Sequence, residues 1–193
     1  MHDFVLSSPN RMLWQYYKCL KRLEKQIETL KGDDEKKQGI VVCVFMAITV
    51  IETFLNLFFR VVVSEKEFLQ QERQVRSDLE CRKSLEHKIR KWPKAIFGES
   101  INFDSGIGKE FMELKNKRNS LMHFTSGHET ISVPGVEIQG LANTAVYDDL
   151  KIEDARSAIN IVEELVKEIF RLRGVEESKV PLLLHSWMGK IHY

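Results

Sequence analysis

Apolar residues recur at helical spacing along most of the chain, beginning just after the segment SSPN. In the first such stretch they lie three, four or seven residues apart and therefore share one face of a helix. These residues are Leu13, Tyr17, Leu20, Ile27 and Leu30. The pattern predicts a helix from about residue 10 to residue 31 that ends near Gly32, followed by a polar turn over residues 32–38.

Residues 39–63 are the most apolar part of the chain and are long enough to cross a membrane. Four polar residues gather on one stripe of this helix: Thr49, Glu52, Thr53 and Asn56. A carboxylate in mid-bilayer costs about 3 kcal/mol by insertion scales, and no second span shelters it. The stripe therefore favours a core helix that faces a site or a subunit interface, with a membrane span as the alternative. Glu52 and Asn56 share a face and can hydrogen-bond to each other, with or without a function.

Ser64 and Glu67 have the spacing of a capping box, which predicts that a third helix starts at residue 64. Its apolar positions continue to Trp92, and Pro93 is expected to end it. The second half of this helix is basic and contains Arg82, Lys83, Lys88, Arg90, Lys91 and Lys94. A run of this kind is either a solvated helix face or a surface that binds phosphate.

The second half of the chain predicts two further helices. Residues 93–108 are expected to form a packed loop, after which helical spacing resumes over residues 109–124. The last helix is expected from near Ile152 to Gly174, with Asp148 or Asp149 as its cap.

Two segments flank that last helix. An insertion at about residues 128–147 alternates apolar and polar residues around Pro134, which predicts a small β-hairpin at about residues 130–139. The C-terminal extension 175–193 is short and apolar, and is expected to dock on the helices or on a partner subunit. The expected fold class is therefore all-α, a bundle of about five helices in one domain that spans residues 1–193.

Composition agrees with this fold class and limits the kinds of partner that the protein can bind. Of 193 residues, 43% are hydrophobic and 30% charged, with only ten Gly and four Pro, which favours long helices. The 29 basic and 28 acidic residues nearly cancel, so a nucleic acid would have to bind a local patch. Cys19, Cys43 and Cys81 fit neither a metal pattern nor a disulfide framework, and the N-terminus does not read as a secretory signal. Both observations predict a reducing, cytoplasmic compartment.

Residues 117–124 read KRNSLMHF and gather a guanidinium, a carboxamide and an imidazole near a helix end. Asn119 and His123 share a face, whereas Arg118 lies about 140° around the axis from His123. Such residues can simply offset the helix dipole and bond to the last carbonyls. Alternatively, a second copy of the helix across a two-fold axis brings the groups together, which predicts a composite site at a dimer interface.

The order Arg118, Asn119, three further residues and His123 resembles the motif of the HEPN superfamily, the "higher eukaryotes and prokaryotes nucleotide-binding" helical domains. The apolar helix that contains IETFLN and the later helix KIEDARSAINIVEELVKEIF also resemble this family, so the likeness covers about residues 10–173. Many members are metal-independent endoribonucleases of toxin–antitoxin and other defence systems, with sites formed between two subunits. Others have lost activity and serve as binding or dimerisation modules.

The resemblance implies a role for each residue of the motif. Arg118 and His123 would be the catalytic pair, Asn119 would orient them, and Glu52 and Asn56 would support them. Imidazole can act as acid or base near neutral pH, and guanidinium can hold two phosphate oxygens at once. Attack by the RNA 2′-hydroxyl would then leave a 2′,3′-cyclic phosphate.

The expected partners are RNA, a second copy of the chain, and an antitoxin or regulatory protein, with no membrane. The basic residues between positions 82 and 94 would bind the RNA. No cofactor is expected, and no metal site, since the chain contains neither HExxH nor a paired CxxC. The alternative function is a non-catalytic helical module that binds a nucleotide, a protein partner or a regulator.

Overall fold

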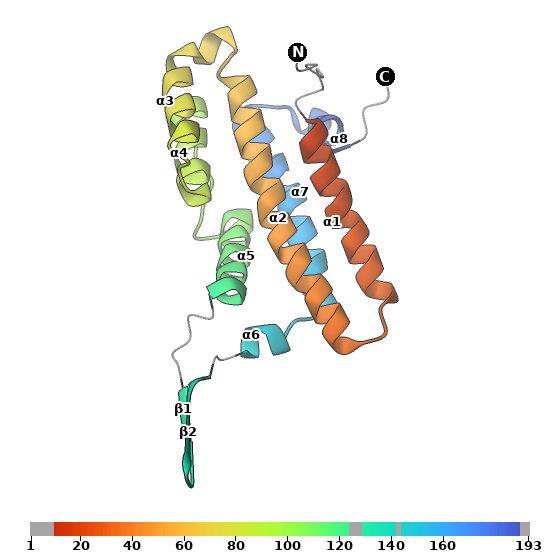
Figure 1. Cartoon of the computed structure of the whole chain (residues 1–193). Coiled ribbons are helices and arrows are strands. Elements are labelled where there is room, and N and C mark those ends of the chain that lie inside the picture. Colours follow the sequence, from red (N-terminus) through yellow and green to blue (C-terminus); the bar gives the residue numbers. More distant parts are fainter. Residues whose placement is uncertain (1–9, 124–128, 142–143, 190–193) are drawn as a thin grey trace, which may run out of the picture.

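Figure 1 shows a computed structural model of the chain, which describes residues 10–123, 129–141 and 144–189. In these ranges the chain forms eight α-helices, two short 3₁₀ helices and one two-stranded sheet. The predicted all-α class is confirmed. The helices outnumber the five or so expected, because one predicted helix is divided in two and two short helices were not foreseen.

Helices α1 (Arg11–Thr29) and α2 (Asp33–Val62) form an antiparallel pair joined by a short connection. The turn predicted over residues 32–38 is wrong, since α2 already begins at Asp33. Three carboxylates occupy its first turn, where they lie near the positive end of the helix dipole. Gly39 permits the close approach of α1, because a Cβ atom there would lie 2.6 Å from a carbon of Ile27.

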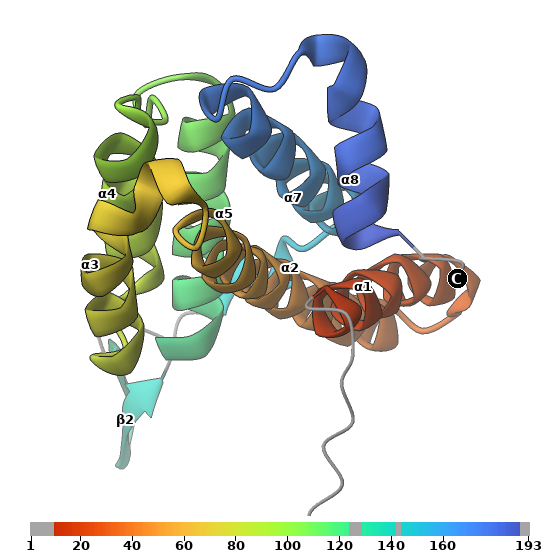
Figure 2. The ribbon, with the colours of Figure 1, turned by 90° about the horizontal axis from the view of Figure 1, so that it is seen from above.

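Helix α2 is the centre of the bundle (Figure 2) and packs against α1, α5 (Gly106–His123) and α7 (Ile152–Leu172). Its buried face carries Phe54 and Phe58, whose rings contact Phe170 of α7. Among the described residues, α2 is the one helix long and apolar enough to cross a membrane, with a mean hydropathy of 2.3 over its most apolar window. Half of that window is buried inside the bundle, in the position predicted for a core helix.

The third predicted helix is two helices, α3 (Leu69–Glu80) and α4 (Leu85–Phe97), separated by a turn in which Arg82 has a φ of 51°. The capping box at Ser64 is also wrong. The Ser64 hydroxyl donates to the carbonyl of Val61 at 2.6 Å, and a 3₁₀ helix (Lys66–Phe68) precedes α3.

Pro93 lies inside α4 and does not end it. The apolar face of α4 is buried on both sides of the proline, by Ile89 and Trp92 before it and by Ile96 after it. Burial of these side chains outweighs the one backbone hydrogen bond that proline cannot donate. The helix ends instead at Gly98, whose φ of 80° suits glycine.

A buried carboxylate joins α3 to α4. Asp78 of α3 is 4% exposed in its side chain. It accepts hydrogen bonds from Trp92 Nε1 (2.9 Å), Gln74 Nε2 (2.8 Å) and the His87 ring (3.2 Å). Burial raises the pKa of Asp78, but the three hydrogen bonds lower it by more, so its pKa lies below the ordinary 3.8.

Replacing Asp78 by asparagine is expected to lower the free energy of unfolding by about 1–2 kcal/mol at neutral pH, because hydrogen bonds to a charged acceptor are lost. A lowered pKa in the folded state stabilises the fold above the unfolded pKa, and this contribution is lost as the pH falls through the folded pKa. The difference between wild type and Asp78→Asn should therefore shrink below about pH 4. Urea unfolding from pH 7 to pH 3 measures it, with Glu80→Gln at the exposed end of α3 as the control. A difference that does not change with pH would contradict this account.

In the chain order, a hairpin and a short helix come between α5 and α7. Strands β1 (Glu129–Val133) and β2 (Val136–Leu141) pair antiparallel, with Ile131 opposite Ile138, and turn at Gly135. The predicted hairpin is therefore present and slightly longer than expected, and it points away from the helices (Figure 1). Helix α6 (Ala145–Asp148) follows, and α7 is capped at Lys151, whose backbone N–H donates to Asp154. The expected cap by Asp148 or Asp149 is wrong.

The C-terminal helix α8 (Val180–Met188) docks on the bundle, one of the two positions expected for this segment. Trp187 packs against Phe54 and Phe58 of α2, and the Asn10 side chain donates to the carbonyl of Ser186.

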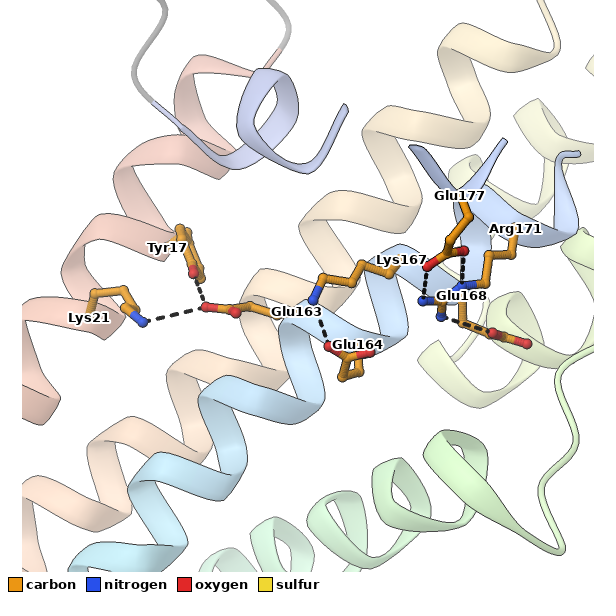
Figure 3. Close-up of polar contacts among 8 residues, drawn as sticks. All are labelled: Tyr17, Lys21, Glu163, Glu164, Lys167, Glu168, Arg171 and Glu177. Carbon is orange, nitrogen blue, oxygen red and sulfur yellow. Dashed lines mark hydrogen bonds and ion pairs between the residues drawn. The ribbon is translucent and has the colours of Figure 1, made fainter. Parts of the chain in front are cut away.

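A row of polar contacts lies along α7 (Figure 3). Tyr17 and Lys21 of α1 both contact Glu163. Nearer the end of α7, Arg171 holds Glu177 of the second 3₁₀ helix (Glu177–Lys179) with two hydrogen bonds of 2.9 and 3.0 Å. These contacts join α7 to α1 and to the segment that leads into α8.

Candidate functional site

Charged side chains on two sides of α5 contact the neighbouring helices. Lys115 contacts Glu86 of α4, and Lys117 contacts Asp154 of α7. The next residue, Arg118, lies about 100° further around the helix and faces α2. Arg118 of the predicted motif therefore faces the predicted polar stripe on α2.

A pocket of about 450 Å³ is lined by residues of both helices. One side of it is polar and consists of the α2 stripe, and Arg118 lies across from that stripe. Its lining residues are Phe45, Ile48, Thr49, Glu52, Thr53, Asn56, Arg118 and Met122. Its volume lies within the range of small-ligand sites. Three of the predicted site residues, Glu52, Asn56 and Arg118, are thus brought together by the fold.

The guanidinium of Arg118 is held on one side only. Its Nη1 donates to Oδ1 of Asn119 at 3.0 Å, the one hydrogen bond that it makes with the described residues. No carboxylate in the described part of the chain lies within ion-pair distance of it. Its other N–H groups can therefore bind an anion that enters the pocket. Asn119 contacts the arginine that it was predicted to orient.

The α2 stripe is bonded differently from the prediction. No hydrogen bond joins Glu52 to Asn56, and Glu52 Oε1 instead accepts from Lys88 Nζ of α4 at 2.7 Å. Oδ1 of Asn56 is shielded from solvent and has no hydrogen-bond partner among the described residues. An unpartnered buried acceptor is costly, and the residue that carries it also lines the pocket.

The six basic residues predicted to bind RNA do not share one surface. Arg82 and Lys83 are exposed in the turn before α4, and Lys91 and Lys94 are exposed on α4 itself. Arg90 is half-buried, bonded to Glu86 at 3.1 Å and placed 4.1 Å from the centre of the Phe103 ring.

Lys88 is buried, with 4% of its side chain exposed, so the prediction that it lies on the basic surface is wrong. The physical reason is its position on α4. It lies one residue before Ile89 and four before Trp92, on the face that packs against the core.

His123 is the last residue of α5, five residues after Arg118 and four after Asn119. Its side chain lies outside the described part of the structure. The predicted meeting of two imidazoles across a dimer axis therefore stays a prediction.

Sequence reasoning missed the ion partner of Glu52 and the apolar wall of the pocket, formed by Phe45, Ile48 and Met122. A half-buried glutamate signals the need for a cation, but the sequence offers 29 Lys and Arg residues as partners. Within the described ranges, no group of three His, Cys, Asp or Glu side chains could hold a metal ion.

Compared with known proteins, the chain matches no protein-family model, no curated protein and no solved structure.

Proposed function

We propose that this protein is a metal-independent endoribonuclease that acts as a homodimer. The observation that carries the proposal is that Arg118 and the polar stripe of α2 line one pocket. Arg118 uses one N–H group to bond Asn119, and its other N–H groups are available to a ligand. The motif and the stripe were each identified by their own spacing, more than 50 residues apart in the chain. Their convergence is expected if both serve one site.

In this proposal Arg118 binds the scissile phosphate. A guanidinium can donate two parallel hydrogen bonds to phosphate oxygens and stabilise the additional charge of the phosphorane. Asn119 holds one edge of the guanidinium, which directs the remaining donors into the pocket. Asn56 and Thr53 line the pocket and would contact the ribose or the base.

His123 supplies the proton transfers. One imidazole accepts the proton of the 2′-hydroxyl as its oxygen attacks phosphorus, and a protonated imidazole donates to the 5′-oxygen as the P–O5′ bond breaks. Two His123 side chains, one from each subunit, can divide these roles. The products are a 2′,3′-cyclic phosphate and a 5′-hydroxyl, and no divalent ion takes part.

Apolar residues beside the pocket support the dimer. Met122 lines the pocket and is 44% exposed, and Val42 of α2, three residues before the pocket residue Phe45, is also 44% exposed. Exposed apolar side chains around a polar site suit a subunit interface. The exposed Arg82, Lys83, Lys91 and Lys94 would bind the RNA backbone outside the pocket. A cytoplasmic role in bacterial defence, with an antitoxin or regulator that controls the site, belongs to the same proposal.

The purified protein incubated with mixed cellular RNA in excess EDTA tests this function. We expect cleavage that leaves 2′,3′-cyclic phosphate and 5′-hydroxyl ends, detected by end-specific labelling. A preparation of the His123→Ala variant controls for contaminating nucleases. Cleavage that EDTA abolishes would contradict the proposal, as would equal cleavage by the variant. RNA binding without any cleavage would favour the alternative of a non-catalytic module.

A further inference from the structure

Lys88 lies in a place that does not favour a lysine. Its side chain is 4% exposed on the core-facing side of α4, and its ammonium lies 5.9 Å from the centre of the Trp92 ring. A buried ion pair adds little net stability compared with apolar side chains of the same shape. Stability of the fold therefore does not explain why a lysine occupies this position.

Its partner, Glu52, belongs to the candidate site. The Glu52 carboxylate is 42% exposed and lines the same pocket as Arg118. A carboxylate and a guanidinium in one pocket form strong bidentate pairs, with the same N–H donors that would hold a phosphate. Yet Glu52 makes no ion pair with Arg118 and binds Lys88 at 2.7 Å instead.

We infer that Lys88 is a positioning residue that holds Glu52 away from Arg118 and so keeps the guanidinium available to RNA phosphate. This inference rests on the proposed function of the same pocket. Lys88 acts through Glu52 and does not touch RNA, in contrast to the phosphate contact expected from the sequence. Lys88 lies behind the pocket and neutralises Glu52, so the pocket lining keeps the positive charge of Arg118. Without Lys88 the charges of Glu52 and Arg118 cancel.

A double substitution distinguishes this indirect role of Lys88 from a direct contact with RNA. In Lys88→Met the freed Glu52 carboxylate pairs with Arg118 and competes with phosphate. In Lys88→Met/Glu52→Gln the competing charge is gone, so Arg118 is released although the lysine is still absent. A lysine that contacts RNA directly would not be rescued in this way.

The test is the affinity of each variant for a fluorescent 2′-O-methyl RNA oligonucleotide, which lacks the attacking hydroxyl and is not cleaved. Fluorescence anisotropy in EDTA should show about tenfold weaker binding by Lys88→Met, the cost of one charge-assisted contact. The double variant should recover most of that loss. Lys25→Met removes an exposed lysine of α1 as the matched control and should change the affinity less than about twofold. Circular dichroism at the assay temperature verifies that each variant is folded.

Wild-type affinity in Lys88→Met would overturn the inference, and so would a double variant as weak as the single one. A second measurement does not depend on RNA. The Nε–H NMR signal of Arg118, assigned by its loss in Arg118→Lys, should move in Lys88→Met and return in the double variant. A signal that stays in place contradicts the inference. A signal that moves in a protein that binds no RNA contradicts the proposed function instead.

Discussion

Replacing Arg118 by alanine is expected to lower the rate of RNA cleavage by about 10²–10³-fold, the usual cost of removing one preorganised charge-stabilising group. Arg118 has a single hydrogen bond to Asn119 among the described residues, and it is the one cation among those that line the pocket, so its loss removes the group that would bind the developing charge. His123→Ala should lower the rate by about 10²–10⁴-fold, because a general acid and base is lost. Single-turnover cleavage of a labelled RNA in EDTA measures both effects.

Two further variants show whether geometry or charge matters at position 118. Arg118→Lys keeps the charge but cannot hold two oxygens in a fixed plane, so it should recover only part of the rate. Arg22→Ala removes an exposed arginine from α1 and should leave the rate unchanged. If Arg118→Ala cleaves RNA as fast as Arg22→Ala, then Arg118 is not in the active site.

The second large effect concerns stability and does not depend on the function. Glu52→Gln is expected to lower the free energy of unfolding by about 3 kcal/mol, because it leaves the buried ammonium of Lys88 without a counter-ion. Lys88→Met should cost less, since the Glu52 side chain that is left behind is 42% exposed and can be solvated. The two substitutions should therefore lower the free energy of unfolding by different amounts. The loss should be larger when the buried partner, Lys88, is the one left unpaired.

Urea unfolding at pH 7 measures this asymmetry. The double variant Lys88→Met/Glu52→Gln should be more stable than Glu52→Gln alone, because no unpaired buried charge is left. Glu35→Gln, an exposed residue in the first turn of α2, is the control and should cost less than about 1 kcal/mol. Equal losses for Glu52→Gln and Lys88→Met would show that burial does not govern the cost.

Helical spacing predicted most of the long helices well, because the buried faces of α1, α2 and α7 follow a period that local sequence displays. The errors lie where a local signal competes with packing. Pro93 reads as a helix end, but the apolar face around it is buried and the helix continues. Ser64 reads as a cap, but its hydroxyl is used by the preceding helix.

At the candidate site, too, local sequence signals predicted some features and packing decided others. The spacing of the α2 stripe and of the α5 motif is local, so both were found in the sequence. Whether Arg118 faces the stripe depends on the rotation of α5 in the bundle, where Phe111 and Leu114 are buried and Lys115 and Lys117 contact α4 and α7. Likewise, one basic run in the sequence contains both a buried lysine and exposed ones, because a helix in a bundle has two sides.

KRNSLMHF by itself determined which chemistry this protein could offer: a guanidinium, a carboxamide and an imidazole within two turns of one helix. Only the tertiary structure decided that Arg118 lines one pocket with Asn56 and Glu52, and that Lys88 neutralises Glu52. The physical reason is distance along the chain. Periodicity acts over a few residues, whereas the pocket and the ion pair join side chains more than 30 residues apart, which packing alone brings together.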